Sequence, residues 1–340
     1  MSKCINSSIR LFFTTAIFFL STFLSLAQFS IHGTYDAYLA SSRNAKDSLP
    51  FMVSSAAINQ MDLNLLELEF RYETKLLTAH LAPAVGSYMR KNYSTELPWR
   101  RNIYEGYLEA KWKKSKIALG SFSSPYTQET PRGVDQLSYS RSLAAEYVPY
   151  YVAGLRWSQD WSSQFSTQFF ITNSWQRLSL SGVRPSLGAL LQWKFDTWNL
   201  NWSHFYGDLA PIGKLPPVLA QNRWRFFQEI NANKKVGNLA FQACAYLGLQ
   251  RHLQQNYLWG QVNVQLQKEF DKHFSVSSRF EYFYDPQQVL STFDQGGFGS
   301  FSVGYLKEFA PVLQLGQELR YFAGSGQQIP VLYSFLRLKF

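Results

Sequence analysis

The stretch that decides the fold is Val331-Leu-Tyr-Ser-Phe-Leu-Arg-Leu-Lys-Phe340, at the end of the chain. Read backwards, one alternate set is Phe340, Leu338, Leu336, Ser334 and Leu332, and the other is Lys339, Arg337, Phe335 and Tyr333. Successive side chains of a β-strand point to opposite faces, so this segment predicts a strand with an apolar face and a face that carries two cations. Stopping on an aromatic residue after such a strand is typical of outer-membrane barrels. That interpretation requires a signal peptide and many further strands of about ten residues.

The amino-terminal segment has the pattern of a secretory signal peptide. Lys3 and Arg10 precede a mainly apolar run, 11–24, and Ser25-Leu26-Ala27 forms a small-x-small cleavage site. We expect cleavage after Ala27, which gives a signal peptide at 1–27 and a mature chain at 28–340. The alternative is an uncleaved helical anchor, but the run is shorter than the roughly 20 apolar residues that a spanning helix needs. Cys244 would be the single cysteine of the mature chain, which excludes an intramolecular disulfide.

Composition supports a membrane protein built from strands. Aromatic residues reach 17%, while the mean hydropathy is −0.21. Only alternate residues of a membrane strand meet lipid, so the average stays polar while Trp and Tyr accumulate at the interfaces. The net charge falls from +10 to +8 without Lys3 and Arg10. We expect no nucleic-acid partner, because the cations alternate with acids along strands and form no patch.

Alternating apolar and polar residues recur along the whole mature chain and predict about sixteen strands. The predicted strands are Phe29–Ala40, Asp62–Tyr72, Lys75–Ala84, Ile103–Trp112, Lys116–Phe122, Val148–Trp157, Trp161–Thr172, Leu187–Phe195, Trp198–Tyr206, Arg223–Asn231, Val236–Leu249, Tyr257–Lys268, Phe274–Tyr284, Gly297–Lys307, Pro311–Tyr321 and Val331–Phe340. In the second, a change of parity predicts a bulge near Leu65. In the fourth, Tyr104, Gly106 and Leu108 are expected on the apolar face.

The connections alternate between short turns and longer polar segments. Short turns follow the even-numbered strands and longer segments, such as 41–56 and 123–146, follow the odd-numbered ones. We therefore predict an all-β, transmembrane, antiparallel up-and-down β-barrel of one domain, with short periplasmic turns and long extracellular loops. The alternative, a secreted β-sandwich, explains neither the terminal Phe nor the systematic loop lengths.

One connection carries a resemblance to a known family. It contains the runs Gly120-Ser-Phe-Ser-Ser-Pro-Tyr126, Tyr139-Ser-Arg-Ser142 and Pro149-Tyr-Tyr-Val-Ala-Gly154. Over about forty residues it resembles the OmpL-like β-barrel porin family of Gram-negative bacteria. The resemblance implies an outer-membrane, pore-forming barrel and carries over no binding site. The Gln28 start and the aromatic content look like secreted proteins of Bacteroidota.

This same segment, 123–146, is the candidate pore constriction. It follows the fifth strand, where many sixteen-stranded porins fold their third loop into the barrel, and a barrel of this width needs something to narrow it. Pro125 and Pro131 restrict its course. The constriction candidates are Glu129, Arg132, Asp135, Arg141 and Glu146. The alternative is a solvated surface loop with ordinary charges.

If the apolar face of each strand meets lipid, the other face lines the pore. The pore-lining candidates are Glu67, Glu69, Arg71, Glu105, Glu109, Arg156, Arg223, Arg225, Arg279, Arg320, Arg337 and Lys339. The late strands are rich in cations and the early ones in acids, which predicts opposed walls and a mild anion preference. The alternative is that these charges are paired and screened, without selectivity.

No catalytic or metal site is expected. The adjacent pair Ser203 and His204 would point to opposite faces of a strand, and the five histidines show no metal-ligand spacing. We predict a porin for small hydrophilic solutes, without a cofactor, in contact with outer-membrane lipid and lipopolysaccharide and with the barrel-assembly machinery through the strand that ends at Phe340. A homotrimer fits sixteen-stranded porins, although no patch identifies a protomer-facing surface. The alternative function is an occluded barrel that serves as a surface platform for polysaccharide or adhesion.

Overall fold

The computed structural model describes residues 28–179, 184–208, 224–252, 255–291, 296–324 and 326–340. The predicted signal peptide and Arg223 lie outside these residues. The strands are β1 (Gln28–Ser41), β2 (Gln60–Glu73), β3 (Leu77–Val85), β4 (Ile103–Trp112), β5 (Ser115–Ser123), β6 (Tyr151–Asp160), β7 (Phe165–Thr172), β8 (Ser186–Lys194), β9 (Trp198–Asp208), β10 (Trp224–Val236), β11 (Leu239–His252), β12 (Gln255–Asp271), β13 (Phe274–Asp285), β14 (Gly296–Ala310), β15 (Leu313–Gly324) and β16 (Gln327–Lys339). The prediction of sixteen strands is confirmed.

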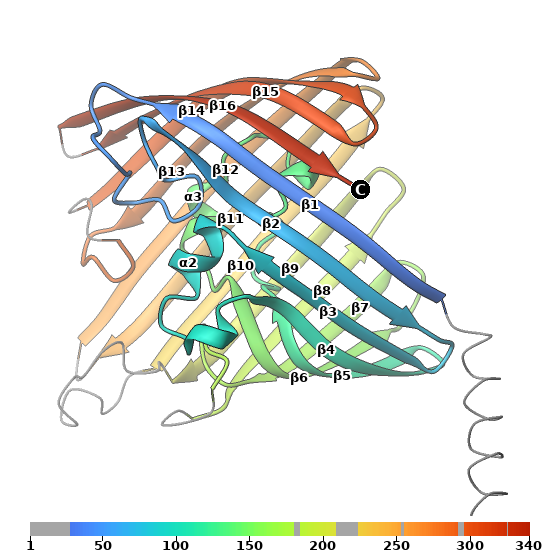
Figure 1. Ribbon diagram of the computed structural model, residues 1–340. Coiled ribbons are helices and arrows are strands. Elements are labelled where there is room, and N and C mark those ends of the chain that lie inside the picture. The colour runs from blue at the N-terminus through green and yellow to red at the C-terminus, as the bar shows by residue number, and fades with distance from the viewer. Residues whose placement is uncertain (1–27, 180–183, 209–223, 253–254, 292–295, 325) are drawn as a thin grey trace, which may run out of the picture.

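The strands form one closed antiparallel barrel in which each pairs with its neighbours in sequence. The barrel closes where β1 pairs with β16, in a register that places Thr34 opposite Lys339 and Ser41 opposite Leu332. Phe340 continues this pairing, because its backbone N–H and C=O both bond to Gly33. The predicted up-and-down topology is therefore confirmed, and Figure 1 shows the tilted strands and the C-terminus near the rim at which β1 begins.

Alternation along each strand separates an inner from an outer face. In β13, Ser275, Ser277, Arg279 and Glu281 are buried, whereas Phe280 and Tyr282 between them are exposed. The same parity gives buried Tyr333, Phe335 and Arg337 and exposed Leu332 and Leu336 in β16. The polar and charged side chains thus point into the barrel, together with aromatic ones such as Phe335, and the outward-facing side chains are mainly apolar.

Two local irregularities change which side chains point inward. The register of β1 and β2 shifts between Asp36 and Ala37, which leaves Asn64 as the extra residue and confirms the bulge expected near Leu65. A second shift, between Ala82 and Pro83 on β3, adds a residue to β4 at Tyr104. Tyr104 is consequently buried, so the prediction that it lies on the outer face was wrong.

The barrel wall is short on the side of β3 to β8 and tall on the side of β10 to β16. Strands β3 to β8 have 8 to 10 residues, whereas β10 to β16 have 12 to 17. The connections between β3 and β4 and between β5 and β6 lie among the short strands, whereas residues 42–59 join the longer strands β1 and β2. Two connections on the loop side are shorter than expected, because β11 and β12, and likewise β15 and β16, run to within two residues of each other.

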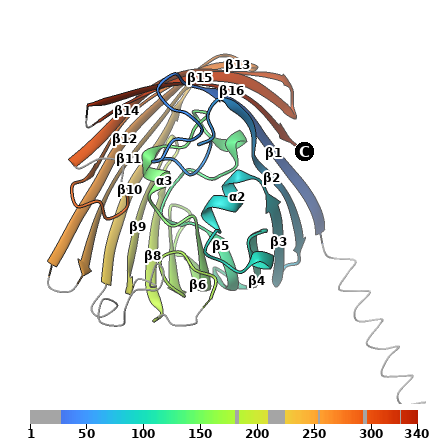
Figure 2. The same cartoon turned by 60° about the vertical axis from the view of Figure 1, so that its left-hand side comes forward.

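In the part of the loops that the structure describes there are four short helices, α2 (Ser87–Asn92), η1 (Pro98–Arg100), η2 (Gly133–Asp135) and α3 (Leu143–Glu146). Figure 2 shows α2, α3 and the chain beside them within the ring of strands. Two loops extend far inward, and we name them the β1–β2 loop (residues 42–59) and the β5–β6 loop (residues 124–150). Their contacts define the interior of the barrel.

Candidate functional site in the barrel interior

The β5–β6 loop leaves the wall at β5 and β6 and crosses the interior to β12 and to the strands beside the seam. Near its middle, Arg132 Nε donates to Glu67 Oε2 on β2 at 2.7 Å. Eight residues further on, the loop reaches the other side of the seam, because the N–H of Ser140 donates to Glu318 Oε2 on β15 at 2.7 Å. Glu129 accepts a hydrogen bond from Gln265 on β12. The loop is therefore held by strands on several sides of the barrel.

Local sequence explains how the loop turns. Ser142 adopts an extended conformation and its Oγ accepts from the N–H of Ala145 at 3.3 Å, which caps α3. Gly133 lies against β16, where a Cβ atom would approach the Nε atom of Arg337 to 2.3 Å. A larger residue at this position would have to displace the Arg337 guanidinium.

A cluster of four buried charges fastens the loop to the tall side of the barrel. Arg279 and Glu281 on β13 and Glu318 and Arg320 on β15 are each no more than 1% exposed. Arg279 Nη2 lies 3.1 Å from Glu318 Oε1, and Arg320 is paired with Glu281. Buried charges need an opposite charge and further hydrogen bonds to be tolerated, and this arrangement supplies the charges.

The loop backbone supplies the remaining hydrogen bonds of that cluster. Arg279 Nη1 donates to the carbonyl oxygen of Ser140 at 2.6 Å, and Glu281 Oε2 accepts from the N–H of Leu143 at 2.6 Å. The Ser140 hydroxyl lies 2.7 Å from Arg279 Nη2. The cluster thus holds the loop by its main chain.

A second group of charges lies on the short side of the barrel. Arg132 bonds Glu67 and also lies 3.4 Å from Glu69. Burial alone would lower the pKa of Arg132, but the hydrogen bonds with Glu67 outweigh it, so the pKa is raised and the guanidinium stays charged. Beside them, His80 has Glu105 Oε2 3.1 Å from Nε2 and stacks on Tyr107.

The β1–β2 loop fills the space next to the β5–β6 loop. Glu146, at the end of α3, accepts from the N–H groups of Val53 and Ser54 at 2.6 and 3.0 Å. Phe51 contacts Phe298 and Phe322 on the wall, with ring centroids 5.3 and 4.7 Å apart. The two loops and the wall therefore share one apolar core within the barrel.

The predicted loop residues all come close to wall or loop partners. Glu129, Arg141 and Glu146 are buried, Arg132 is half-buried and Asp135 is exposed and paired with Lys339 at 3.0 Å. The guanidinium of Arg141 lies over the rings of Tyr88 and Tyr150. The loop is thus inside the barrel for most of its length.

The predicted wall residues within the described part of the chain face the interior. The buried ones are Glu67, Glu109, Arg225, Arg279, Arg320 and Arg337, and the more accessible ones are Glu69, Arg71, Glu105, Arg156 and Lys339. Many are paired locally, as Arg156 is with Glu109 at 2.9 Å. Much of the charge on the wall is therefore balanced by an opposite charge close by.

Sequence reasoning missed several residues of the interior. Ser140 accepts hydrogen bonds from Arg279 of the buried charge cluster with both its carbonyl oxygen and its hydroxyl. His80 lies between the carboxylates of Glu69 and Glu105. It also missed the Asn and Gln side chains on β8 to β12, which point inward at alternate positions. Their alternation is visible in the sequence, although uncharged side chains carry no sign of a pore-lining role.

Three further patterns would indicate another kind of site in the described residues: a membrane-spanning helix, a metal site and a Ser–His pair. No helix among them is long and apolar enough to cross a membrane, and no three His, Cys, Asp or Glu side chains there are grouped as metal ligands. Ser203 faces inward and is buried, whereas His204 faces outward. The two side chains therefore do not meet.

The interior loop and the closed barrel agree with a comparison of the sequence with family models. The model described as "Putative beta-barrel porin-2, OmpL-like" matches residues 28–332. The chain belongs to this family. As an OmpL-like porin it is a channel-type barrel of the outer membrane, and its exposed outer face meets lipid.

Solved structures similar to this OmpL-like porin are also porins. OmpT of Vibrio cholerae in its trimer form has a TM-score of 0.63 at 9% identity, covering 92% of this chain and 99% of that one. An anion-selective porin from Comamonas acidovorans has 0.61 at 9%, covering 92% and 100%. OmpF of Salmonella typhi in complex with daunomycin has 0.65 at 10%, covering 93% and 98%. At these identities the likeness shows the fold alone. Among curated protein sequences, none matches this chain.

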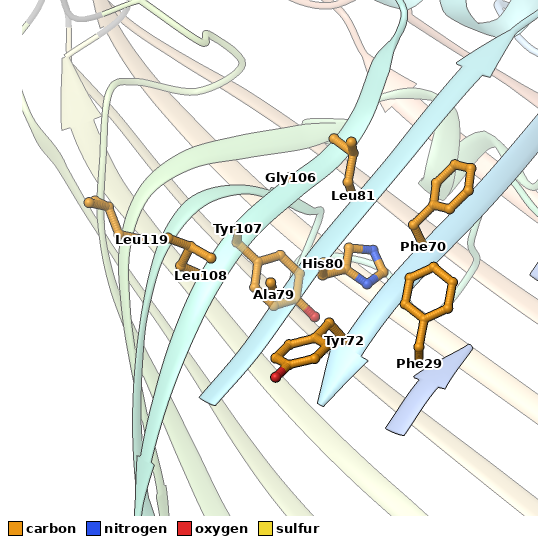
Figure 3. A pocket seen from close by; sticks show the side chains of 10 residues that line it. All are labelled: Phe29, Phe70, Tyr72, Ala79, His80, Leu81, Gly106, Tyr107, Leu108 and Leu119. Atoms are coloured by element: carbon orange, nitrogen blue, oxygen red, sulfur yellow. The ribbon is translucent and has the colours of Figure 1, made fainter. Parts of the chain in front are cut away.

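A hollow on the outer wall of the OmpL-like porin lies over β1 to β5 (Figure 3). Its rim is formed by outward-facing Phe29, Leu81, Leu108 and Leu119, which are 48 to 66% exposed. Small residues at Ala79 and Gly106 leave the depression between them. Because this surface faces lipid, the hollow belongs to the membrane interface and is separate from the interior.

Proposed function

We propose that this OmpL-like porin lets small hydrophilic solutes diffuse passively through the barrel, past a constriction formed by the β5–β6 loop. The observation that carries the proposal is that this loop leaves the wall at β5 and β6 and is attached to β12 through Glu129 and to β15 through Ser140. A segment held at both sides of a wide barrel narrows the aqueous path that such a barrel would otherwise leave open.

A mild anion preference is part of the proposal. Its support is the surplus of cations in the chain and the arginines Arg279, Arg320 and Arg337 on the tall wall. Against it stand the local ion pairs, which reduce the field that a passing ion meets. The similar porin from Comamonas acidovorans is described as anion-selective. The anion preference is a prediction, and a measurement of the reversal potential under a salt gradient tests it.

A second function is favoured by one observation. The β1–β2 and β5–β6 loops share an apolar core with the wall, and Tyr139 stacks on Phe335 at 4.3 Å within it. A barrel whose interior is packed in this way suits an occluded platform at the cell surface, for polysaccharide or adhesion. Neither the channel nor the surface platform requires a catalytic site.

The remaining assignments complete the proposal. We infer cleavage of residues 1–27, a single barrel domain over 28–340, and contacts with lipid, lipopolysaccharide and the barrel-assembly machinery. OmpT of Vibrio cholerae is described in trimer form, and we propose a homotrimer here. Chemical cross-linking in detergent tests the assembly, and the mass of the mature chain tests the cleavage.

The experiment that tests the channel is single-channel recording of the refolded protein in a planar bilayer under a salt gradient. Discrete conductance steps are expected, with a reversal potential on the anion side. Loss of that preference in Arg132→Ala or Arg141→Ala would support a position of the loop along the ion path. Absence of conductance from folded, inserted protein would overturn the channel and favour the platform.

A further inference from the structure

One side of the barrel interior is lined by carboxamides and few charges. Inward positions of β8 to β12 hold Gln192, Asn201, Asn231, Gln261, Asn263 and Gln265. Arg225 and Glu229 on β10 also point inward, but the buried ion pairs lie at the seam, where charged residues are paired with each other and with the loop. The interior thus has an ionic side and a neutral polar side.

The carboxamides of neighbouring strands are hydrogen-bonded in a row around the wall. Gln192 Nε2 donates to Asn201 Oδ1 at 3.1 Å, and Asn201 Nδ2 donates to Asn231 Oδ1 at 2.8 Å. The row continues to Gln168 on one side and to Glu229 on the other. Each carboxamide has two N–H donors and a carbonyl with two lone pairs, so the row retains free donors and acceptors.

Next to this row, buried polar atoms have no partner. Both polar atoms of Gln261, the Oδ1 atom of Asn263, the hydroxyl of Tyr246 and Nε1 of Trp259 make no hydrogen bond with the described residues. These four side chains are at most 5% exposed. The strand register places Gln261 opposite Tyr246, and Trp259 and Asn263 on the same face of β12. Buried polar groups are rarely left unpaired, so this group is built to meet water or a polar solute.

The chemistry of the group favours a particular solute. A hydroxyl donates and accepts at once, as a carboxamide does, so a polyhydroxylated solute can satisfy donors and acceptors of the row together. Apart from the carboxyl of Glu229 at its end, the row offers a passing ion only neutral groups. We propose that this wall binds and guides neutral polyhydroxylated solutes, such as sugars. The proposal rests on the proposed channel function.

The test is a swelling assay with proteoliposomes that contain the full-length folded protein. Glucose is compared with citrulline, a zwitterion of similar mass without sugar hydroxyls. Wild-type vesicles are expected to swell faster in glucose. In Asn201→Leu with Gln261→Leu the glucose rate is expected to fall about fivefold or more, because each lost hydrogen bond weakens the interaction. The citrulline rate is expected to change less than about twofold.

Gln228→Leu is the matched control, because Gln228 lies on the outward face of β10 between Phe227 and Glu229. It is expected to leave both rates unchanged. If the leucine variant does not fold, Asn201→Asp keeps the size and polarity of the side chain, and it is expected to lower the ratio of glucose to citrulline swelling.

The outcomes separate this inference from the proposed function. Equal wild-type rates for the two solutes, or equal losses in the double variant, would overturn the sugar preference and leave the channel intact. No swelling with either solute from folded wild-type protein would overturn the channel itself, and with it the passage of sugars.

Discussion

Arg320 on β15 donates from Nη1 to the carbonyl oxygen of Arg141 in the β5–β6 loop, at a distance of 2.8 Å. The same guanidinium is paired with Glu281 and lies 3.0 Å from the Ser140 hydroxyl. It is fully buried. A single wall residue thus neutralises a buried carboxylate and fixes the main chain of the loop, which makes it the best point at which to release the loop.

Replacing Arg320 with Met should destabilise the barrel and loosen the loop. The change leaves the buried Glu281 carboxylate without its closest cation, and breaking a buried pair in this way costs about 3–5 kcal/mol. We expect a lower temperature for the heat-induced change in gel migration. We also expect a larger or more variable single-channel conductance, because the loop loses one of its anchors.

Two comparisons make this result specific. Arg320→Met combined with Glu281→Gln removes both charges and should regain much of the lost stability, as pairs removed together often do. Arg90→Met applies the same replacement to an arginine of α2 whose side chain is 72% exposed, and it should behave as wild type. An Arg320→Met protein with wild-type stability and conductance would show that this anchor does not hold the loop.

Arg132 and Glu67 should shift ion selectivity in opposite directions. Arg132→Gln leaves Glu67 and Glu69 without this cation, so the reversal potential should move toward cations. Glu67→Gln leaves Arg132 in excess and should move it toward anions. Both shifts should be larger at about 0.1 M than at about 1 M salt, because salt screens charges in water.

The control for this pair is Lys235→Gln, which breaks an exposed ion pair with Glu269 and should not change selectivity. Shifts of Arg132→Gln and Glu67→Gln in the same direction would mean that the variants act by loosening the loop, and would contradict an electrostatic role for the pair.

The fold could be predicted from the sequence because strand alternation is a local property. In Phe274–Asp285 every second residue is buried, and the polar ones among them are visible in the sequence itself. Tyr104 was placed on the wrong face because one extra residue in β4 reverses the parity, and alternation cannot reveal a register shift that depends on the neighbouring strand.

The interior could be predicted only in outline. The charges of the β5–β6 loop were visible, but their partners were not, because Glu67 lies 65 residues before Arg132 and Glu318 lies 178 residues after Ser140. Such pairs depend on closure of the whole barrel. The carboxamide row was missed for another reason, since Asn and Gln in a strand look the same whether they bond each other or face solvent.

Cys244 should report the position of the loop. It is buried on the inner face of β11, opposite Asn231 and Asn263, and α3 lies against β11 to β13. A charged thiol reagent should therefore label it slowly in the folded protein and rapidly after unfolding. Arg320→Met should accelerate labelling of the folded protein, and Cys244→Ser supplies the blank. Rapid labelling of the wild type would contradict a covered thiol.

Gly33 and Phe340 should determine how well the barrel closes. The N–H of Gly33 donates to the carbonyl oxygen of Phe340 at 2.7 Å, and the N–H of Phe340 donates back at 3.1 Å. The phenyl ring covers Gly33 so closely that a Cβ atom there would lie 2.1 Å from Phe340 Cζ. Gly33→Val should push the ring away and lower stability by about 1–3 kcal/mol, as overpacking does elsewhere. The measurement is the midpoint temperature of heat-induced gel migration.

The ring itself can be removed to test this explanation. In Gly33→Val with Phe340→Ala the valine has no ring to displace, so the midpoint should rise above that of Gly33→Val alone. The backbone bonds of residue 340 remain in this variant, which separates the effect of the ring from that of strand pairing. Ile31→Val, on the same outer face of β1, controls for a valine at this end of the strand. If Gly33→Val has the same midpoint temperature as the wild type, the Phe340 ring does not need the space above Gly33. Closure of the barrel then depends on the backbone pairing of β1 and β16 alone.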